Sequence, residues 1–414
     1  MNVQTKSGSE EPGQQQASNP QNAGRRRRRS RLWTIIAGIL FIMTPVASQA
    51  EEGNIHIGQL RVHPFVSVDE TFSDNVYYTA TEQKRDTIIT YTPGIKLDLP
   101  MGRQLVEAEY YAVADRYRTF KGEDTTDHNA SGLMDFKIGS PLELRLSYVF
   151  TKGHEGRSMS STGFIEVFRN NIATASASYQ LPGRSKVQFD AGKSTWDFIQ
   201  SPFRDRREDL YAGYFYYRFL PKTSAFVEYD RKKAVYDDQS LGLDSIESRE
   251  LVGLTWDITE KSKGTIKVGR VQKDFESPSQ EDFRGWTGFV DLRHAFSEDT
   301  SLLISGLRTV NEANVFGTSF YVTTGGSGEF TQRLFRKLAI VARGSYGKDV
   351  FSNPVPPEMI TREDKTSMAG GGLKYTIRDW FELGADYNYR ARNSNIPAND
   401  YREHEYIISA SAAF

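Results

Sequence analysis

The feature that most constrains this chain is a strict alternation of apolar and polar residues over long strand-like runs. In Leu142–Phe150 the apolar residues fall on one face and the charged residues on the other, and Phe381–Arg392 repeats the pattern. A period of two predicts β-strands. These runs of 9 and 12 residues match a tilted transmembrane strand, which needs about 9–11 residues. Strands of soluble proteins are typically about 5–6 residues long.

Short turns divide the chain at regular intervals. Eight of them begin at residues 99, 139, 181, 220, 258, 296, 333 and 377, which are 37 to 44 residues apart. Several carry Gly or Pro, which supply the backbone angles of tight turns. Eight turns join nine hairpins, so the sequence predicts an all-β, antiparallel, up-and-down transmembrane barrel of about 18 strands, an even number as bacterial single-chain barrels require. The predicted strands cover 62–72, 86–98, 104–118, 127–138, 142–152, 167–180, 186–197, 207–219, 223–235, 245–258, 263–275, 282–295, 300–311, 317–332, 337–349, 363–376, 380–391 and 402–414.

The main rival fold is a soluble β-propeller, which also repeats at about 40 residues. A propeller blade contains four short strands. Each repeat of this chain contains two long strands, and no Trp-Asp signature is present. The barrel is therefore favoured, with its tight turns and both of its ends in the periplasm and its longer loops outside.

Composition supports this choice. Hydrophobic residues make up 38% of the chain and the mean hydropathy is −0.55, which excludes a bundle of transmembrane helices. A barrel tolerates these values because only alternate strand residues face lipid. The formal net charge of −1 gives no indication of nucleic-acid binding. The chain has no cysteine, so disulfides, thiolate metal sites and cysteine nucleophiles are excluded.

The first 50 residues are typical of a targeting segment. A polar stretch leads to a basic run at Arg25–Arg29, an apolar run at Leu32–Val46 and a small-residue end at Ser48–Ala50. This order predicts a secretory signal cleaved after Ala50. The apolar run is shorter than the roughly 20 residues of a transmembrane helix, although an uncleaved anchor is the alternative. The predicted domains are 1–50, a polar leader and cleavable signal peptide; 51–61, a short periplasmic segment; and 62–414, the barrel.

The C-terminus carries the most specific local pattern. The last strand ends on an aromatic residue with apolar or small residues at every second preceding position, namely Tyr406, Ile408, Ala410, Ala412 and Phe414. This pattern resembles the tag that the barrel-assembly machinery reads. Ala412 departs from it, since many such tags carry a larger residue there. The barrel-assembly machinery and outer-membrane lipid are therefore expected partners.

Charged residues are frequent on the face opposite the apolar one. Stripes of charge in a dry core would be very costly, so we predict a wet interior, which a barrel of this width provides. No plug domain precedes the barrel and no predicted loop is long enough to fold inward, which predicts an unplugged, weakly constricted pore. The predicted pore-lining residues are Glu107, Glu109, Asp115, Glu143, Arg145, Glu228, Asp230, Asp257, Asp291, Arg293, Glu382, Asp386, Arg390 and Arg392.

Catalytic and metal motifs are not apparent. The six histidines include no pair at a spacing of three or four residues, so no compact metal motif is predicted. No Gly-x-Ser-x-Gly and no defensible Ser/His pair is present. We therefore expect no enzyme activity and no cofactor.

One region resembles a known family. Asp74-Asn75-Val76-Tyr77 is followed by Asp86 and then by Pro93-Gly94-Ile95. This resembles the first hairpin of the β-barrel porin 2 family of outer-membrane proteins, and the resemblance covers 55–414. Such proteins are often associated with exopolysaccharide systems, so the resemblance implies a role in moving surface polysaccharide. It carries over no catalytic residue. Asp74 and Asn75 are expected to cap the first external loop through bonds to nearby backbone.

The sequence thus predicts a pore in the outer membrane of a Gram-negative bacterium. The leading hypothesis is exopolysaccharide export. Polysaccharide and a periplasmic export protein are then the expected partners. The alternatives are a general diffusion porin for small hydrophilic solutes and a structural or adhesive barrel. The oligomeric state stays open, with a monomer favoured.

Overall fold

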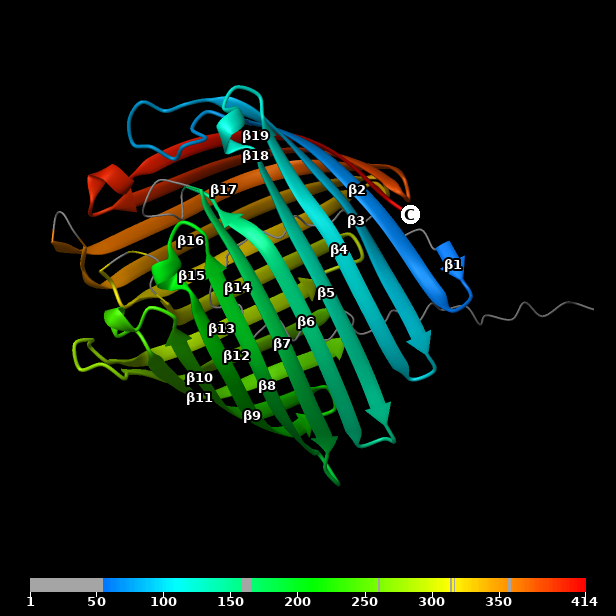
Figure 1. Ribbon diagram of the computed structural model, residues 1–414. Coiled ribbons are helices and arrows are strands. Elements are labelled where there is room, and N and C mark those ends of the chain that lie inside the picture. The colour runs from blue at the N-terminus through cyan, green and yellow to red at the C-terminus, as the bar shows by residue number, and fades with distance from the viewer. Residues whose placement is uncertain (1–54, 158–164, 260, 313–314, 316, 356–358) are drawn as a thin grey trace, which may run out of the picture. The chain divides into compact units, whose positions relative to one another are not determined.

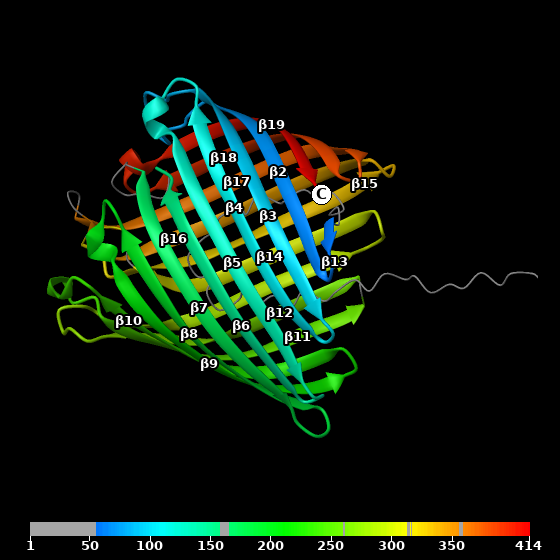
Figure 2. The ribbon, with the colours of Figure 1, turned by 45° about the vertical axis from the view of Figure 1, so that its right-hand side comes forward.

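The computed structural model describes residues 55–157, 165–259, 261–312, 315, 317–355 and 359–414. These residues form one antiparallel sheet in which each long strand pairs with the next strand in the chain. The sheet closes because the last strand, β19 (Tyr401–Ala413), pairs with β2 (Leu60–Ser73). Figures 1 and 2 show the resulting barrel, with short turns at one end and longer loops at the other. The all-β, eighteen-stranded up-and-down barrel predicted from the sequence is confirmed.

The remaining strands follow in chain order. They are β1 (Ile55–Ile57), β3 (Asp86–Met101), β4 (Gln104–Tyr117), β5 (Thr125–Ile138), β6 (Leu142–Glu155), β7 (Glu166–Gln180), β8 (Ser185–Phe198), β9 (Arg206–Leu220), β10 (Thr223–Tyr236), β11 (Ser245–Thr259), β12 (Ser262–Phe275), β13 (Phe283–Ala295), β14 (Thr300–Glu312), β15 (Phe320–Leu334), β16 (Leu338–Val355), β17 (Ile360–Arg378) and β18 (Phe381–Ser394). Single-turn 3₁₀ helices lie in four of the longer loops, at Lys121–Glu123, Pro202–Arg204, Gln239–Leu241 and Pro397–Asn399. Within the described ranges, no helix is long and apolar enough to cross a membrane.

Most predicted strand ends lie within three residues of the observed ones, and several coincide with them. Two strands run further than predicted, β16 and β17, because their ladder resumes at Pro354↔Thr361 beyond a register shift. The short strand β1, which pairs with the start of β2, was not predicted and lies within the expected segment 51–61. The predicted leader 1–50, with its cleavage after Ala50, lies outside the described residues.

The two faces of the barrel wall differ in exposure and in contacts. Large apolar side chains such as Leu146 and Tyr148 on β6 are exposed at alternate positions of the strands. The intervening side chains include pairs that bond past a neighbouring strand, as Glu228 on β10 bonds Lys267 on β12 at 2.6 Å. A contact that skips a strand must lie on the concave side of the sheet. The apolar face therefore points outward to lipid and the charged face points inward.

The first hairpin holds the closure of the barrel. The Asn75 side chain is fully buried and donates to the backbone oxygens of Thr79 and Arg402, both at 2.9 Å. Asp74 accepts a hydrogen bond from the backbone N–H of His404 at 2.8 Å. These bonds shape the first external loop, as the sequence predicts, and also tie that loop to β19. The residues that carry the family resemblance thus lie at the seam where the barrel closes.

We expect Asn75→Ala to lower the free energy of unfolding by about 2–3 kcal/mol, because it removes the hydrogen bonds of a buried side chain to the backbone of Thr79 and Arg402. Equilibrium unfolding by urea in phospholipid vesicles measures this change. Asn393→Ala, at an exposed position on β18, is the matched control and should cost less than about 0.5 kcal/mol. Equal losses in the two variants would contradict a role of Asn75 in closure.

The C-terminal pattern extends to the last residue. Tyr406 and Ile408 are exposed on the outward face, and the inward and outward residues alternate along β19. Phe414 donates its backbone N–H to the carbonyl of Pro64 at 2.9 Å and stacks on Trp380 at 5.3 Å between ring centroids. Ala410 and Ala412 lie half-buried between β18 and β2. Recognition of these residues by the barrel-assembly machinery stays a prediction.

Candidate functional site in the barrel interior

The exposure of interior ion pairs falls from one end of the barrel to the other. Near the short turns, the side chains of Lys137 and Glu143 are 42% and 54% exposed at a separation of 3.9 Å. Near the longer loops, Arg204 and Glu155 are each 8% exposed and form a bidentate pair at 2.8 and 2.9 Å. Water therefore reaches the interior at the end with the short turns and is largely excluded at the end with the longer loops.

The ends of β14 and β15 account for this difference. We call Thr309–Glu312 and Phe320–Thr323 together the inward segment. The ladder between β13 and β14 stops at Gly288↔Arg308, although β13 continues to Phe283 and β14 to Glu312. Beyond that point the end of β14 pairs only with β15 and turns into the interior. The end of β15 keeps its ladder with β16, from Tyr321↔Phe351 to Thr323↔Asp349.

Glu312 anchors one face of the inward segment to the interior side of β10 and β12. Its carboxylate bonds the ammonium groups of Lys232 at 2.8 Å and Lys273 at 2.7 Å, and it accepts a hydrogen bond from the Tyr236 hydroxyl at 2.8 Å. The Lys273 and Glu312 side chains are 0% and 2% exposed. Glu247 also pairs with Lys232 at 3.4 Å. Several cations and carboxylates thus balance one another in a buried cluster, as buried charges require.

Apolar contacts accompany these ion pairs. Val310 and Val322 of the inward segment pack with Phe320 and with Val271, which lies on the interior face of β12. All four side chains are buried. By strand alternation Val310 and Val322 would point to lipid. Because the strand ends turn inward, both side chains instead make contacts in the interior.

The other face of the inward segment lies against the neighbouring strand β16. Tyr321 stacks on its ladder partner Phe351 with 5.2 Å between ring centroids. It also has electrostatic interactions with Glu155 of β6 and with Arg204 from the loop between β8 and β9. The inward segment thus lies on the interior side of β10 and β12 and narrows the lumen at this end. The expected unplugged and weakly constricted pore stays a prediction.

Loop lengths in the sequence do not predict this constriction, because no long loop forms it. Only residues 313–319 separate β14 from β15, and the strand ends themselves turn inward. The one signal in the sequence is Glu312, an acidic residue at the position of β14 that alternation assigns to the lipid side. Lys232 and Glu247 share an interior face with predicted residues on β10 and β11, so the alternation could have included them.

The predicted pore-lining residues are spread around the interior instead of forming one cluster. Several have partners from other strands: Asp115 with Thr90, Arg145 with Asp135, Glu228 with Lys267, Asp386 with Arg343 and Arg390 with Glu405. Glu143 and Asp257 lie at the exposed end, whereas Asp230 and Arg392 are buried. The structure places the others on the interior face of their strands, namely Glu107, Glu109, Asp291, Arg293 and Glu382.

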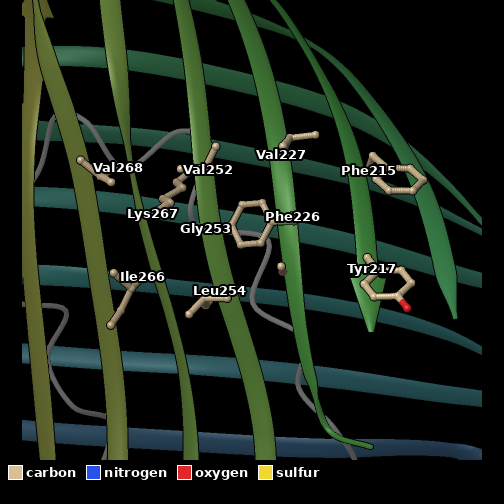
Figure 3. Close-up of a pocket in the computed structure, with 11 residues that line it drawn as sticks. Phe215, Tyr217, Phe226, Val227, Val252, Gly253, Leu254, Ile266, Lys267 and Val268 are labelled. Carbon is tan, nitrogen blue, oxygen red and sulfur yellow. The ribbon is translucent and has the colours of Figure 1, made fainter. Parts of the chain in front are cut away.

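The outward face carries an apolar hollow on β9 to β12, which Figure 3 shows in close-up. Its outward side chains are Phe215, Tyr217, Val227, Val252, Leu254, Ile266 and Val268. An apolar hollow on this face suits lipid chains. In the part of the chain that the structure describes, no three His, Asp or Glu side chains come together as metal ligands.

Comparison with known proteins identifies the family. The model of the family described as "Putative beta-barrel porin 2" matches residues 51–414. The chain belongs to this family. It is accordingly a porin-like β-barrel of the Gram-negative outer membrane. No curated protein matches the sequence.

Solved structures similar to this family member are outer-membrane proteins. OpdK from Pseudomonas aeruginosa is 8% identical, with a TM-score of 0.48 and coverage of 87% of this chain and 100% of that one. OccK9 (OpdG) from the same organism is 12% identical, with a TM-score of 0.47 and coverage of 86% and 98%. OccAB2 from Acinetobacter baumannii is 11% identical, with a TM-score of 0.47 and coverage of 86% and 99%. The similarity is limited to the general barrel architecture.

Proposed function

We propose that this protein is a constricted outer-membrane pore for small hydrophilic solutes, acting by transport and not by catalysis. The observation that carries the proposal is the interior itself, which is charged and exposed near the short turns and narrowed by the inward segment near the longer loops. Charged walls favour hydrated solutes, and a lumen that the inward segment narrows selects by size and charge. This is the diffusion-porin alternative of the sequence analysis, with a constriction added.

Exopolysaccharide export is the second candidate. The family resemblance implies export. The end of β13 also favours it, because its edge toward β14 has no ladder partner beyond Gly288↔Arg308. The inward segment can pair with that edge and so leave the lumen. A polymer chain needs a lumen that is clear along its whole length. With the inward segment in its present position, we expect polymer to be excluded. Polysaccharide and a periplasmic export partner therefore stay proposals, as does the monomeric state.

Swelling of liposomes that contain the purified barrel tests the main proposal. We expect monosaccharides and amino acids to enter at measurable rates and oligosaccharides to enter at least about tenfold more slowly, since hydrated walls and a narrow passage act together. The same liposomes without protein are the control. Absence of swelling in every small solute would reject the diffusion pore.

A clean deletion strain separates the two candidates. Loss of surface polysaccharide together with its accumulation in the periplasm would favour export. Normal surface polysaccharide together with slower uptake of small solutes would favour the diffusion pore.

A further inference from the structure

The free edge of β13 and the inward segment of β14 are complementary in register. The existing ladder pairs Gly288 with Arg308 and Val290 with Gly306. Extending the same register places Val310 opposite Trp286, Asn311 opposite Gly285 and Glu312 opposite Arg284. All of these residues belong to strands, and no insertion or deletion separates the two edges.

The residue pattern also fits that extended ladder. In the wall, Val310 would point to lipid beside Trp286, which is 55% exposed on the outward face. Asn311 would point to the interior. Glu312 would lie on the outward face beside Arg284, which is exposed, and opposite charges directly across two strands attract. Each of these three positions of β14 therefore has a suitable environment in the wall.

The same residues also have suitable partners in the interior. Val310 packs on Val271 there, and Glu312 bonds Lys232 and Lys273. One sequence thus satisfies two arrangements of the same strands, which is the property of a two-state element. The two states exchange a buried ion cluster for a completed ladder and an exposed ion pair.

We propose that the inward segment is a gate that moves between the interior and the barrel wall. In the interior it constricts the pore; in the wall its β14 part completes the ladder with β13 and clears the lumen, while its β15 part keeps its ladder with β16. The inference rests on the proposed pore function and deepens it, because it assigns the regulation of the same passage. A ligand shifts such an equilibrium by the difference between its affinities for the two states, so a solute or polymer that bonds Lys232 and Lys273 in place of Glu312 favours the open state.

Arg308 marks the point where the gate leaves the wall. Its guanidinium donates to the backbone carbonyl of Trp286 at 3.2 Å and to the Thr324 hydroxyl at 2.7 Å, and it stacks on the Trp286 ring at 4.8 Å. The Thr287 hydroxyl donates to the Arg308 carbonyl at 2.7 Å. These bonds satisfy polar groups at the free edge of β13, which membrane surroundings would otherwise penalise.

Disulfide trapping tests the gate directly, because the chain has no cysteine of its own. The pair Asn311→Cys and Gly285→Cys comes within bonding distance only in the wall state. We expect oxidation in lipid vesicles to link this pair, to raise single-channel conductance at least about threefold, and to be reversed by a reductant. The pair Val290→Cys and Gly306→Cys, which are partners in the existing ladder, is the control and should link without a change in conductance.

An exposed substitution provides a second test. Arg284→Gln removes the partner of Glu312 in the wall state and touches neither the lumen nor the ion cluster. We expect it to lower the open fraction of channel recordings by about two- to fivefold, which is the range of an exposed ion pair. Arg270→Gln, at an exposed outward position on the neighbouring strand β12, should leave the open fraction unchanged.

The outcomes separate the gate from the pore. If the Asn311/Gly285 cysteine pair never links while the control pair does, or if Arg284→Gln and Arg270→Gln behave alike, the gate is overturned. The pore proposal then still stands, provided that a barrel lacking the inward segment conducts. If that shortened barrel does not conduct, the pore proposal itself fails.

Discussion

Replacing Thr309–Thr323 with an Asn-Gly turn should raise the single-channel conductance of the barrel on the order of threefold or more. Arg308 and Thr324 are ladder partners, and Asn-Gly forms the two-residue turn that joins such strands. The replacement removes the whole inward segment, including three β15 residues that pair with β16, and keeps the rest of the wall. An eighteen-stranded barrel with an empty interior is wide enough for an aqueous channel. Recordings in planar bilayers measure the change.

The control for this experiment is a change in another external loop. Ala80–Gln83 lies in the loop between β2 and β3, is exposed and is far along the chain from the inward segment. Shortening it to Gly-Gly should leave the conductance within about a third of the wild-type value. If removal of the inward segment has no larger effect than this control, the segment does not constrict the pore.

Breaking the buried pair of Arg204 and Glu155 should have the largest effect on stability. Arg204→Met leaves the Glu155 carboxylate buried without its bidentate partner, and we expect a loss of about 3–5 kcal/mol in the free energy of unfolding. Arg204 also stacks on Phe198 at 3.9 Å, a contact that Met partly keeps. The double variant Arg204→Met, Glu155→Met buries no charge and should recover most of the loss. Urea unfolding in vesicles measures all three proteins.

The exposed pair of Lys137 and Glu143 supplies the matched control. Both side chains are close to half exposed, so Lys137→Met should cost less than about 1 kcal/mol. The two variants compare the loss of a buried ion pair with the loss of an exposed one in the same interior. If Arg204→Met costs no more than Lys137→Met, water surrounds Arg204 and the inward segment does not exclude it.

Much of this barrel follows from local pattern. The alternation in Leu142–Phe150 predicted the outward face that Leu146 and Tyr148 occupy. The eight turns predicted the number and order of the strands, because each tight turn forces the next strand to run back beside the last. The resemblance centred on Asp74 and Asn75 predicted the family, and the structure adds that these residues tie the first loop to β19.

The constriction required the tertiary structure. Local alternation assigns Val310 and Glu312 to the lipid face of β14, and in the wall state proposed above that assignment would be correct. Their interior positions depend on Val271, Lys232 and Lys273, which lie on strands two and four places away along the sheet. No period in the sequence encodes contacts between strands that are not neighbours.

The sequence by itself therefore determined the barrel, its strand order, the faces of its strands and its family. A hydrogen-bonded ladder between consecutive strands needs only alternation and turns, both of which are local. Only the tertiary structure decided where the interior is open and where it is closed, because the energies of Glu312 with Lys273 and of Arg204 with Glu155 depend on contacts between elements that are not neighbours in the sheet.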